Sequence, residues 1–433
     1  MTLRKLATAA LAFVLASASS FAQEKIIVVN EGNWQSDNGR LSYFEDGKIV
    51  SNEWFREKNG YKIGDTPNDI IQINDDLIAL SINWSNIIQY IRPDGTAVAA
   101  TEDVPNNRKL CSDGKYVYIS SYGHECLVNG QMETFERGYV AKVDLSTFKV
   151  IKAVEVGYEP EGIALYKGHL FVANTGGYAF NEPHEYEHTV DVIDAESMKI
   201  VRSVETETIN LYGKMSQVGQ YLCINSPGDY YDVQGATLIF DCQAVLDGKA
   251  DADCFVKLEY AATYNCPTPD GKFLAIGSRF SYYTNEYTFN YVTIDPAEVM
   301  EYNGTSGVYD ELPGTVLEDL KKMEMPYGIY VNPYTGYIYA TDAGNFAAAG
   351  ALLQWTPEGK YVGKWKIYIN PGHFLALPPD GHFGGVEDIV AGPMEADPDP
   401  NAPMFNLQGI RISRPIPGQL YIRNGRKFIA TNR

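Results

Sequence analysis

The sequence predicts an all-β fold, a seven-bladed β-propeller of four-stranded blades whose ring closes by pairing of the N- and C-terminal strands. Apolar content is ordinary at 45%, yet helical periodicity is confined to one stretch, residues 316–323. The 433-residue chain contains 39 Gly, 22 Pro and 31 Tyr, which suits many strands joined by tight turns. A unit of about 50 residues also recurs seven times, as repeat architectures require.

Each unit contains a strand, a turn, a second strand that ends in a small polar residue, a variable loop, a third strand and a fourth. The pattern is clearest at Glu161–Leu165, Leu170–Asn174, Val190–Asp194 and Lys199–Val204, which alternate or run apolar at strand length. The turn that closes the third strand marks every unit. It recurs at Asp46-Gly47, Pro93-Asp94-Gly95, Asp144-Leu145-Ser146, Asp194-Ala195-Glu196, Asp241-Cys242, Asp295-Pro296 and Thr356-Pro357-Glu358-Gly359.

The first unit lacks its opening strand, because it starts directly with Ile26–Asn30. A strand of the missing kind follows the seventh unit, at Gly372–Leu377. Exchanging a strand in this way pairs the two ends of the repeat region in one sheet and leaves no unpaired blade. We therefore expect a closed ring over residues 23–377, and a monomer, because a closed ring has no free edge.

The N-terminal 22 residues have the features of a secretory signal peptide. Arg4 and Lys5 precede an apolar run over residues 6–16, and Ser20 and Ala22 stand at signal-peptidase spacing. The run is too short to span a membrane, and no later run is longer. We expect an exported protein that begins near Gln23 and resides at the cell surface or outside the cell, otherwise in the periplasm.

The last residues suggest a separate tail. Residues 378–403 are rich in Pro, Gly, Asp and Ala without periodicity, which is typical of a linker. Residues 404–433 have the pattern of two short strands around a turn, with a basic end. This segment resembles the C-terminal sorting tail of type IX secretion substrates; the alternative is an ordinary terminal hairpin.

Charge and cysteine content exclude several functions. The net charge of −20 argues against nucleic acids and anionic lipid surfaces, which need clustered Lys and Arg. Six cysteines in an exported chain permit disulfides, and their spacing fits no zinc motif. The pairs Cys242–Cys254, Cys111–Cys126 and Cys223–Cys266 are candidates, with free buried thiols as the alternative for the last two.

The repeat units are similar to those of YVTN and YncE-type seven-bladed propellers over roughly residues 25–377. Asn30-Glu31-Gly32-Asn33-Trp34 together with Leu41-Ser42-Tyr43 resembles the Bacteroidetes branch of that group. Some members of the branch capture cobalamin beside a TonB-dependent outer-membrane transporter, so the resemblance implies corrinoid capture. This chain differs from those lipoproteins, because no cysteine stands near the expected cleavage point and the chain ends in the sorting-like tail.

The candidate site lies on the face where the variable loops converge, here called the loop face. In a propeller the loops between second and third strands emerge on the same side as the connections between blades. These loops carry aromatic and polar residues: Asn33, Trp34, Asn83, Trp84, Tyr122, Tyr178, Asp229, Tyr230, Arg279, Phe280, Tyr282 and Asn345. First strands open with Asn68, Arg108, Glu161, Tyr212, Tyr264, Tyr327 and His373, and Asn174, Asn225 and Asp342 close second strands. Such a surface suits a large, flat ligand with amide or hydroxyl groups, although loop aromatics can also pack between blades.

Three functions remain open from the sequence. The first is a non-enzymatic binder of a corrinoid or a similar large nutrient, and the second is a protein or glycan interaction module. The third is a metal-dependent hydrolase or lyase, for which no nucleophile elbow, HExxH motif or phosphate-binding glycine loop is present. For the third, residues 184–188 (HEYEH) could offer metal ligands, and Glu31, Glu161, Asp229 and Asp342 could form a Ca²⁺ site or an acid/base pair. No other cofactor is expected.

Overall fold

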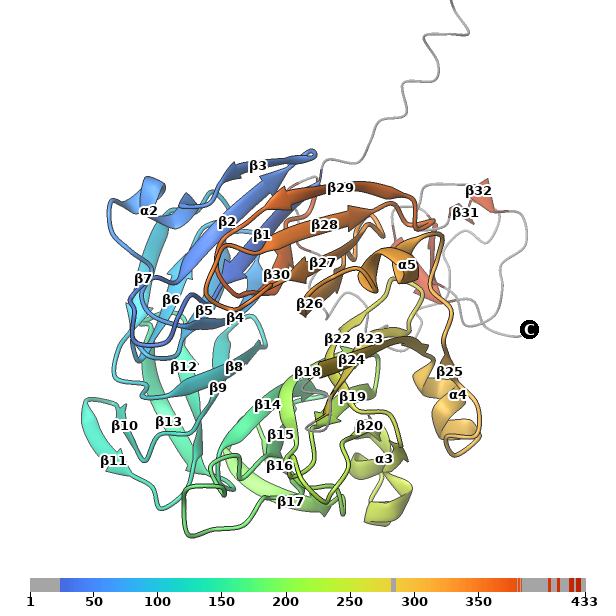
Figure 1. Cartoon of the computed structure of the whole chain (residues 1–433). Coiled ribbons are helices and arrows are strands. Elements are labelled where there is room, and N and C mark those ends of the chain that lie inside the picture. Colours follow the sequence, from blue (N-terminus) through green and yellow to red (C-terminus); the bar gives the residue numbers. More distant parts are fainter. Residues whose placement is uncertain are drawn as a thin grey trace, which may run out of the picture. The chain divides into compact units, whose positions relative to one another are not determined.

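The computed structural model describes residues 24–281, 286–379, 381 and 383, together with four short strands nearer the C-terminus. The chain divides into two compact units, residues 1–381 and 382–433. In the first unit, seven four-stranded antiparallel sheets form a ring (Figure 1), which confirms the predicted β-propeller. We number the sheets as blades 1 to 7 in chain order.

The blades are built alike, with each strand hydrogen-bonded to the next. Their strands are β30 (Pro371–Ala376), β1 (Lys25–Asn30), β2 (Arg40–Glu45) and β3 (Lys48–Ser51) in blade 1; β4 (Pro67–Asn74), β5 (Leu77–Ile82), β6 (Ile87–Ile91) and β7 (Ala97–Thr101) in blade 2; β8 (Asn107–Ser112), β9 (Tyr116–Ser121), β12 (Tyr139–Asp144) and β13 (Lys149–Glu155) in blade 3; β14 (Pro160–Tyr166), β15 (His169–Asn174), β16 (Thr189–Asp194) and β17 (Lys199–Glu205) in blade 4; β18 (Tyr212–Val218), β19 (Tyr221–Ser226), β20 (Ala236–Asp241) and β21 (Phe255–Leu258) in blade 5; β22 (Ala262–Pro267), β23 (Phe273–Ser281), β24 (Glu286–Ile294) and β25 (Val308–Tyr309) in blade 6; and β26 (Pro326–Val331), β27 (Ile338–Asp342), β28 (Ala351–Trp355) and β29 (Tyr361–Lys366) in blade 7.

The hydrophobic core lies between neighbouring blades. The strands β4, β8, β14, β18, β22, β26 and β30 contact one another in a circle and therefore surround the axis. Second strands such as β1 (KIIVVN) are almost continuously buried, because both faces of each blade are covered by its neighbours. Phe171 of blade 4, for example, meets Phe240 of blade 5 edge-on with ring centroids 6.1 Å apart.

The ring closes as the sequence predicts, because β1 pairs with β2 on one side and with β30 on the other. In this sheet Val28 lies opposite Ser42 and also opposite Phe374, so residues separated by most of the chain are held in register. Blade 1 therefore contains both ends of the repeat region. Without β30 the blade would lack its innermost strand.

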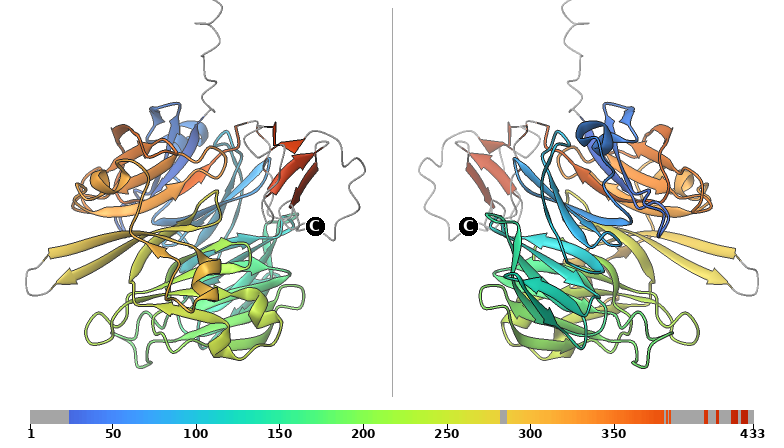
Figure 2. Two further views of the ribbon diagram at one scale, coloured as in Figure 1. Left: turned by 90° about the vertical axis from the view of Figure 1, so that its right-hand side faces the viewer. Right: turned by 90° about the vertical axis from the view of Figure 1, so that its left-hand side faces the viewer.

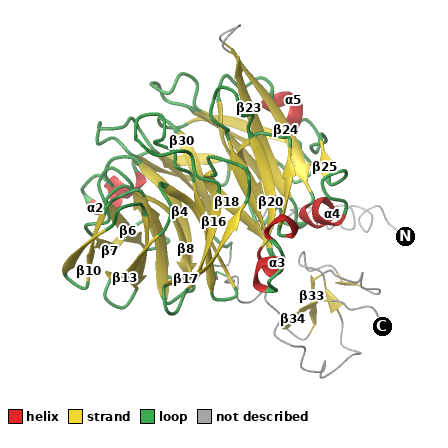
Figure 3. Cartoon of the chain, turned by 90° about the horizontal axis from the view of Figure 1, so that it is seen from below, coloured by secondary structure: helices red, strands yellow, loops and turns green. Residues whose placement is uncertain are grey.

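Insertions decorate the blades. Short helices α2 (Trp54–Asn59), α3 (Cys242–Leu246), α4 (Pro296–Glu301) and α5 (Val316–Leu320) and the 3-10 turn η1 (Asp251–Asp253) accompany the strands (Figure 3). They have six residues or fewer. Helix α5 lies within residues 316–323, where the sequence shows a helical period, and the other helices are too short for such a period to appear. A small hairpin, β10 (Glu125–Val128) with β11 (Gln131–Thr134), follows β9, and the nine-residue strands β23 and β24 project beyond the ring (Figure 2).

The second unit contains a four-stranded sheet in the order β32-β31-β33-β34. Its strands are β31 (Met404–Phe405), β32 (Arg411–Ile412), β33 (Leu420–Arg423) and β34 (Arg426–Ile429). The expected leader, residues 1–22, and nearly all of the expected linker lie outside the described residues. Among the helices that the structure describes, none has the length and apolar character needed to cross a membrane.

The candidate disulfides are not formed. All six cysteines lie within the described part of the ring, and each is a free thiol. Cys242 starts helix α3 instead of lying on a strand, and Cys254 ends the η1 turn with its thiol directed at the Ala250 carbonyl, 3.2 Å away. The pair was a candidate because both cysteines were expected on adjacent strands. That expectation was wrong, because the chain turns into a helix directly after Asp241.

Removing the Phe374 ring should weaken ring closure. Phe374 is buried on β30 and stacks on Tyr330 of blade 7, with ring centroids 5.4 Å apart. We expect Phe374→Ala to lower the free energy of unfolding by about 3 kcal/mol, as for other buried phenylalanines. Urea denaturation measures the change, and Phe180→Ala, at a ring that is 67% exposed, is the matched control with a change within about 0.5 kcal/mol. Equal effects of the two substitutions would contradict the prediction.

Candidate functional site

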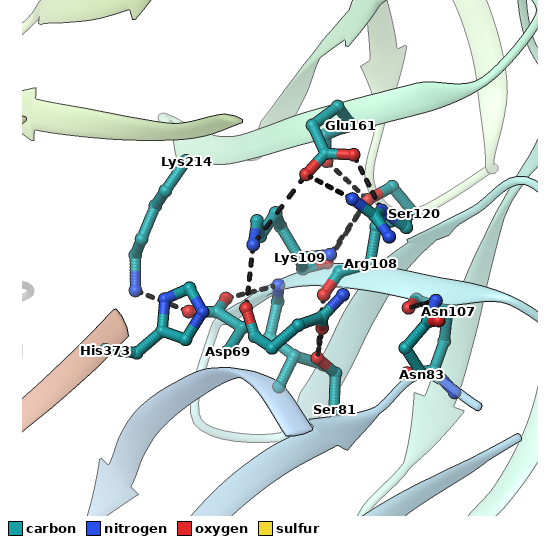
Figure 4. A network of polar contacts seen from close by, with 12 residues as sticks. Asp69, Ser81, Asn83, Asn107, Arg108, Lys109, Ser120, Glu161, Lys214 and His373 are labelled. Atoms are coloured by element: carbon teal, nitrogen blue, oxygen red, sulfur yellow. Dashed lines mark hydrogen bonds and ion pairs between the residues drawn. The ribbon is translucent and has the colours of Figure 1, made fainter. Parts of the chain in front are cut away.

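The seven innermost strands share a backbone irregularity near their first residues. In each, the pairing with the second strand shifts register, the mark of a β-bulge. The residues that the sequence predicts at the openings of the first strands stand at these positions: Asn68, Arg108, Glu161, Tyr212, Tyr264, Tyr327 and His373. Bulges re-aim side chains, and here they bring polar groups from different blades together at the axis (Figure 4).

Glu161 of blade 4 is the most heavily bonded of these residues. Its buried carboxylate accepts two hydrogen bonds from the Arg108 guanidinium, at 2.7 and 3.1 Å, and one from the Tyr122 hydroxyl. Lys109 Nζ lies 3.7 Å from the same carboxylate and donates to the Asn68 carbonyl at 2.7 Å. Burial alone would raise the pKa of Glu161, but Arg108 and Lys109 hold it below its usual range. These contacts tie blades 2, 3 and 4 together.

A second ion pair crosses the axis. Lys214 on β18 of blade 5 donates to Asp69 on β4 of blade 2 at 2.7 Å (Figure 4). Asp69 is completely buried, and its other oxygen accepts from the Leu110 backbone N–H at 2.9 Å. Burial favours a raised pKa at Asp69, but Lys214 and Lys109 outweigh it and lower the pKa. Side chains thus occupy the axis at this level.

A third group lies where the ring closes. Glu31, directly after β1, accepts from His373 Nε2 at 2.8 Å and from the Tyr327 hydroxyl at 2.7 Å. Burial works to raise the pKa of Glu31, but the two donors lower it. Burial lowers the pKa of His373 and nearby Lys109 lowers it further, although Glu31 opposes both. The hydrogen bonds therefore favour a charged Glu31, whereas the net effect at His373 favours a neutral imidazole.

The loops around the axis present exposed aromatic rings. Trp34 and Trp84, from blades 1 and 2, meet edge-on at 5.0 Å and are 62% and 47% exposed. Tyr178 packs edge-on against Tyr122 at 5.4 Å. Tyr327, a half-buried residue of β26, contacts two further rings. Further exposed aromatics of the loops are Phe180, Tyr230, Tyr231 and Phe346. All belong to the loop face, as the sequence predicts.

Two of these aromatics have strained backbones. Tyr230 has φ +67° and Phe346 has φ +61°, in the left-handed region that bulky residues seldom adopt. Each stands in a loop between a second and a third strand, next to a residue that organises the turn. Asp229 accepts from the backbone of Tyr231 and Val233, which holds the Tyr230 loop. Strain of this kind is concentrated at functional sites.

Several predicted polar residues instead have structural roles. Their hydrogen-bonding groups are used inside the protein: Asn83 with Asn106 and Asn107, Asn174 with Thr189 and Asp191, Asn225 with Thr263 and Asn265, Asp342 with Met325 and Gly344, and Asn345 with Ala347 and Ala348. Asn33 donates to the Phe346 carbonyl at 2.9 Å and so links two loops of the loop face. The side chains of Arg279 and Phe280, and Tyr282 as a whole, lie outside the described part.

Sequence reasoning missed three charged residues at the axis, Asp69, Lys109 and Lys214. The first two directly follow the selected residues Asn68 and Arg108 in the chain. Strand alternation would normally turn adjacent side chains to opposite faces, so only one of each pair is expected at the axis. The bulges remove that restriction. A charged residue within an otherwise apolar inner strand was the signal that could have identified them.

Metal binding is not supported among the described residues, where no three His, Cys, Asp or Glu side chains are grouped to hold an ion. Of the segment 184–188, His184 lies 3.4 Å from Glu159 and His188 lies 2.7 Å from Glu205. Glu31 and Glu161 are bonded to protein donors, as are Asp229 and Asp342. The suggested Ca²⁺ site therefore has no assembled ligand set in this part of the chain.

Comparison with known proteins identifies the fold alone. No family model matches the chain, and no curated protein matches it. Among solved structures it is similar to hydrazine synthase from Kuenenia stuttgartiensis (16% identity, TM-score 0.52, covering 73% of this chain and 90% of that one). It is also similar to a quinoprotein alcohol dehydrogenase-like protein from Bacteroides thetaiotaomicron (9%, 0.53, 82% and 78%) and to a proposed 6-phosphogluconolactonase from Bacteroides fragilis (11%, 0.52, 83% and 99%).

Stability should depend on His373 in mildly acidic solution. The pKa of His373 is lowered from 6.5, so just below pH 6.5 the unfolded chain binds a proton that the folded protein does not. The free energy of unfolding should therefore fall with decreasing pH, by up to about 1.4 kcal/mol per pH unit from this group. His373→Gln, which keeps a donor for Glu31, should make the decline shallower.

Urea titrations at pH 7.0, 6.0 and 5.5 measure this dependence. His169→Gln removes a histidine whose ring bonds locally, to the Lys167 carbonyl, and serves as the control. An unchanged slope in His373→Gln would show that the histidine does not link stability to pH.

Proposed function

We propose that this propeller is a non-enzymatic binding protein that holds a large ligand with flat apolar surface on its loop face. The observation that carries the proposal is the concentration of exposed rings there. Of the described side chains, both exposed tryptophans and both exposed phenylalanines lie in loops between second and third strands. Exposed aromatic clusters usually mark contact surfaces.

Rigidity beneath the rings supports the same proposal. The axis cluster fixes the starts of the inner strands, so the loops above it have firm anchors. Preorganised aromatic side chains lose little conformational entropy on binding. Tyr230 and Phe346 keep strained backbones in the absence of a ligand, so the hydrogen-bonded turns beside them fix the positions from which their rings project.

A binding role is favoured over catalysis because the acids at the axis are engaged. Asp69, Glu161 and Glu31 each accept hydrogen bonds on both carboxylate oxygens from protein donors. A general acid or base needs a free position toward its substrate. We accordingly assign these carboxylates to holding the blades together.

A corrinoid such as cobalamin is the first ligand that we propose. Its macrocycle offers a broad apolar surface and its periphery offers hydrogen-bonding groups, which suits rings interspersed with polar residues. The resemblance to YncE-type propellers and the leader-like residues 1–22 lead us to propose further that capture occurs after export, at the cell surface, and that a TonB-dependent transporter receives the ligand.

A protein or glycan partner is the second candidate. Tyr231 is 80% exposed and Phe180 is 67% exposed, so both project well beyond their neighbours. Side chains that stand out from the surface suit a broad macromolecular contact better than an enclosing pocket.

Titration of the purified protein with cyanocobalamin, followed by absorbance and calorimetry, tests the proposal. We expect saturable binding that Trp84→Ala and Tyr230→Ala each weaken about tenfold, the usual effect of removing a central aromatic contact. Tyr302→Ala is the matched control, because Tyr302 is 51% exposed but follows α4, between a third and a fourth strand. Absence of binding at millimolar ligand would refute the corrinoid proposal and favour a macromolecular partner.

A further inference from the structure

Lys214 occupies an unusual position in the axis cluster. It is the third residue of β18, and the Asp69 carboxylate that it contacts stands on the opposite side of the ring, 145 residues away in sequence. The side chain therefore extends across the axis at the level where the inner strands begin (Figure 4). Blades 3 and 4 separate the two partners along the ring.

The ammonium group is the solvent-facing end of this ion pair. The Lys214 side chain is 41% exposed, whereas Asp69 is 0% exposed, and Arg108 and Lys109 are 15% and 7% exposed. An ammonium has three N–H donors. Asp69 takes one of them, and Lys214 has no second hydrogen-bond partner among the described residues. Positive charge with unused donors is thus presented to solvent above a buried counter-charge.

The surroundings of Lys214 offer further donors rather than acceptors. Tyr212, two residues earlier on the same strand, is 44% exposed, lies near the charges of Glu161 and Arg108, and has no hydrogen-bond partner for its hydroxyl within the described part of the chain. The neighbouring carboxylates are already saturated by donors of the protein. A ligand group that reaches this point meets free N–H and O–H groups.

We propose that Lys214 and Tyr212 form a subsite for an oxyanion, a carboxylate, phosphate or sulfonate group of the bound ligand. The assignment rests on the proposed loop-face binding. It adds that the ligand group nearest the axis is negatively charged. The oxyanion accepts from the free donors of Lys214 and from the Tyr212 hydroxyl. Asp69 accepts one hydrogen bond from the Lys214 ammonium and so positions it. Its negative charge also weakens the attraction of the ammonium for the oxyanion.

The subsite also explains how an acidic protein can take an anionic group. At a net charge of −20 the molecule repels anions at long range. A partly buried ammonium is screened less than a surface charge and acts at contact distance. The aromatic loops together with the exposed Lys214 ammonium would select a ligand that carries both a ring system and an oxyanion.

A pair of fluorescent probes separates the subsite from the aromatic surface. 8-Anilinonaphthalene-1-sulfonate and N-phenyl-1-naphthylamine share a ring system, and only the first carries a sulfonate. We expect both to bind the purified protein at the loop face, with Trp84→Ala weakening both. Lys214→Met should weaken the sulfonate probe about tenfold, the worth of one hydrogen bond to a charged group, and leave the uncharged probe within about twofold.

Substitution of Asp69 gives the sharper test, because its effect has the opposite sign. Asp69→Asn keeps an acceptor for Leu110 but removes the competing charge, so the sulfonate probe should bind several-fold more tightly. A purely structural ion pair would give losses in both single variants. The double variant Asp69→Asn/Lys214→Met leaves no buried unpaired charge and should show the loss of Lys214→Met even if that single variant folds poorly.

The outcomes distinguish the two proposals. If Trp84→Ala alters neither probe, loop-face binding itself is refuted. If Trp84→Ala weakens both probes but Lys214→Met does not discriminate between them, the aromatic site stands and the oxyanion subsite is refuted.

Discussion

The pairing of β1 with β30 is the constraint on which the rest of this structure depends. Each inner strand can reach the axis only if the seven blades stand in a closed ring, and the ring closes only where the two ends of the repeat region share a sheet. Backbone hydrogen bonds between β1 and β30, reinforced by packing of Phe374 on Tyr330, make that closure. Once it is made, no blade lacks its innermost strand.

Closure then creates the axis cluster. Glu31 and His373 come from strands that pair only because the ring is shut, and the Asp69–Lys214 bridge needs opposite blades at a fixed separation. Charged groups with so little exposure would be unfavourable alone, because each has left water. They are accommodated because every acid is paired with a donor from another segment. Because these pairs form only when the blades have their native arrangement, the cluster also stabilises that arrangement.

The function that we propose is divided between this rigid axis and the loops above it. The cluster leaves little freedom to the starts of the inner strands, while the loops differ in length and sequence from blade to blade and bear the exposed rings. The aromatic surface would supply affinity for flat groups, and Lys214 would supply a preference for an oxyanion. Both roles use side chains that the fold holds in place before a ligand arrives.

The sequence by itself determined the seven units, their four-stranded pattern, the exchanged terminal strand and the aromatic character of the loop face. These features are local or periodic, so turn chemistry and strand-length apolar runs reveal them. It indicated α5 but not α2, α3 or α4, and it left free thiols as an alternative for only two of the cysteine pairs. The helix at Cys242 was missed because the chain leaves its strand at one residue and no period records that change.

Only the tertiary structure decided which polar residues meet. In the sequence, Asn174 and Asn225 could not be told apart from the residues that reach the axis. In the structure their amides form hydrogen bonds within a blade (Asn174) and between blades (Asn225). Asp69, Lys109 and Lys214 came to the axis through bulges and ring closure. Asp69 and Lys214 are 145 residues apart and Glu31 and His373 are 342 apart. The geometry of the closed ring brings such partners together, and no local pattern in the chain encodes those distances.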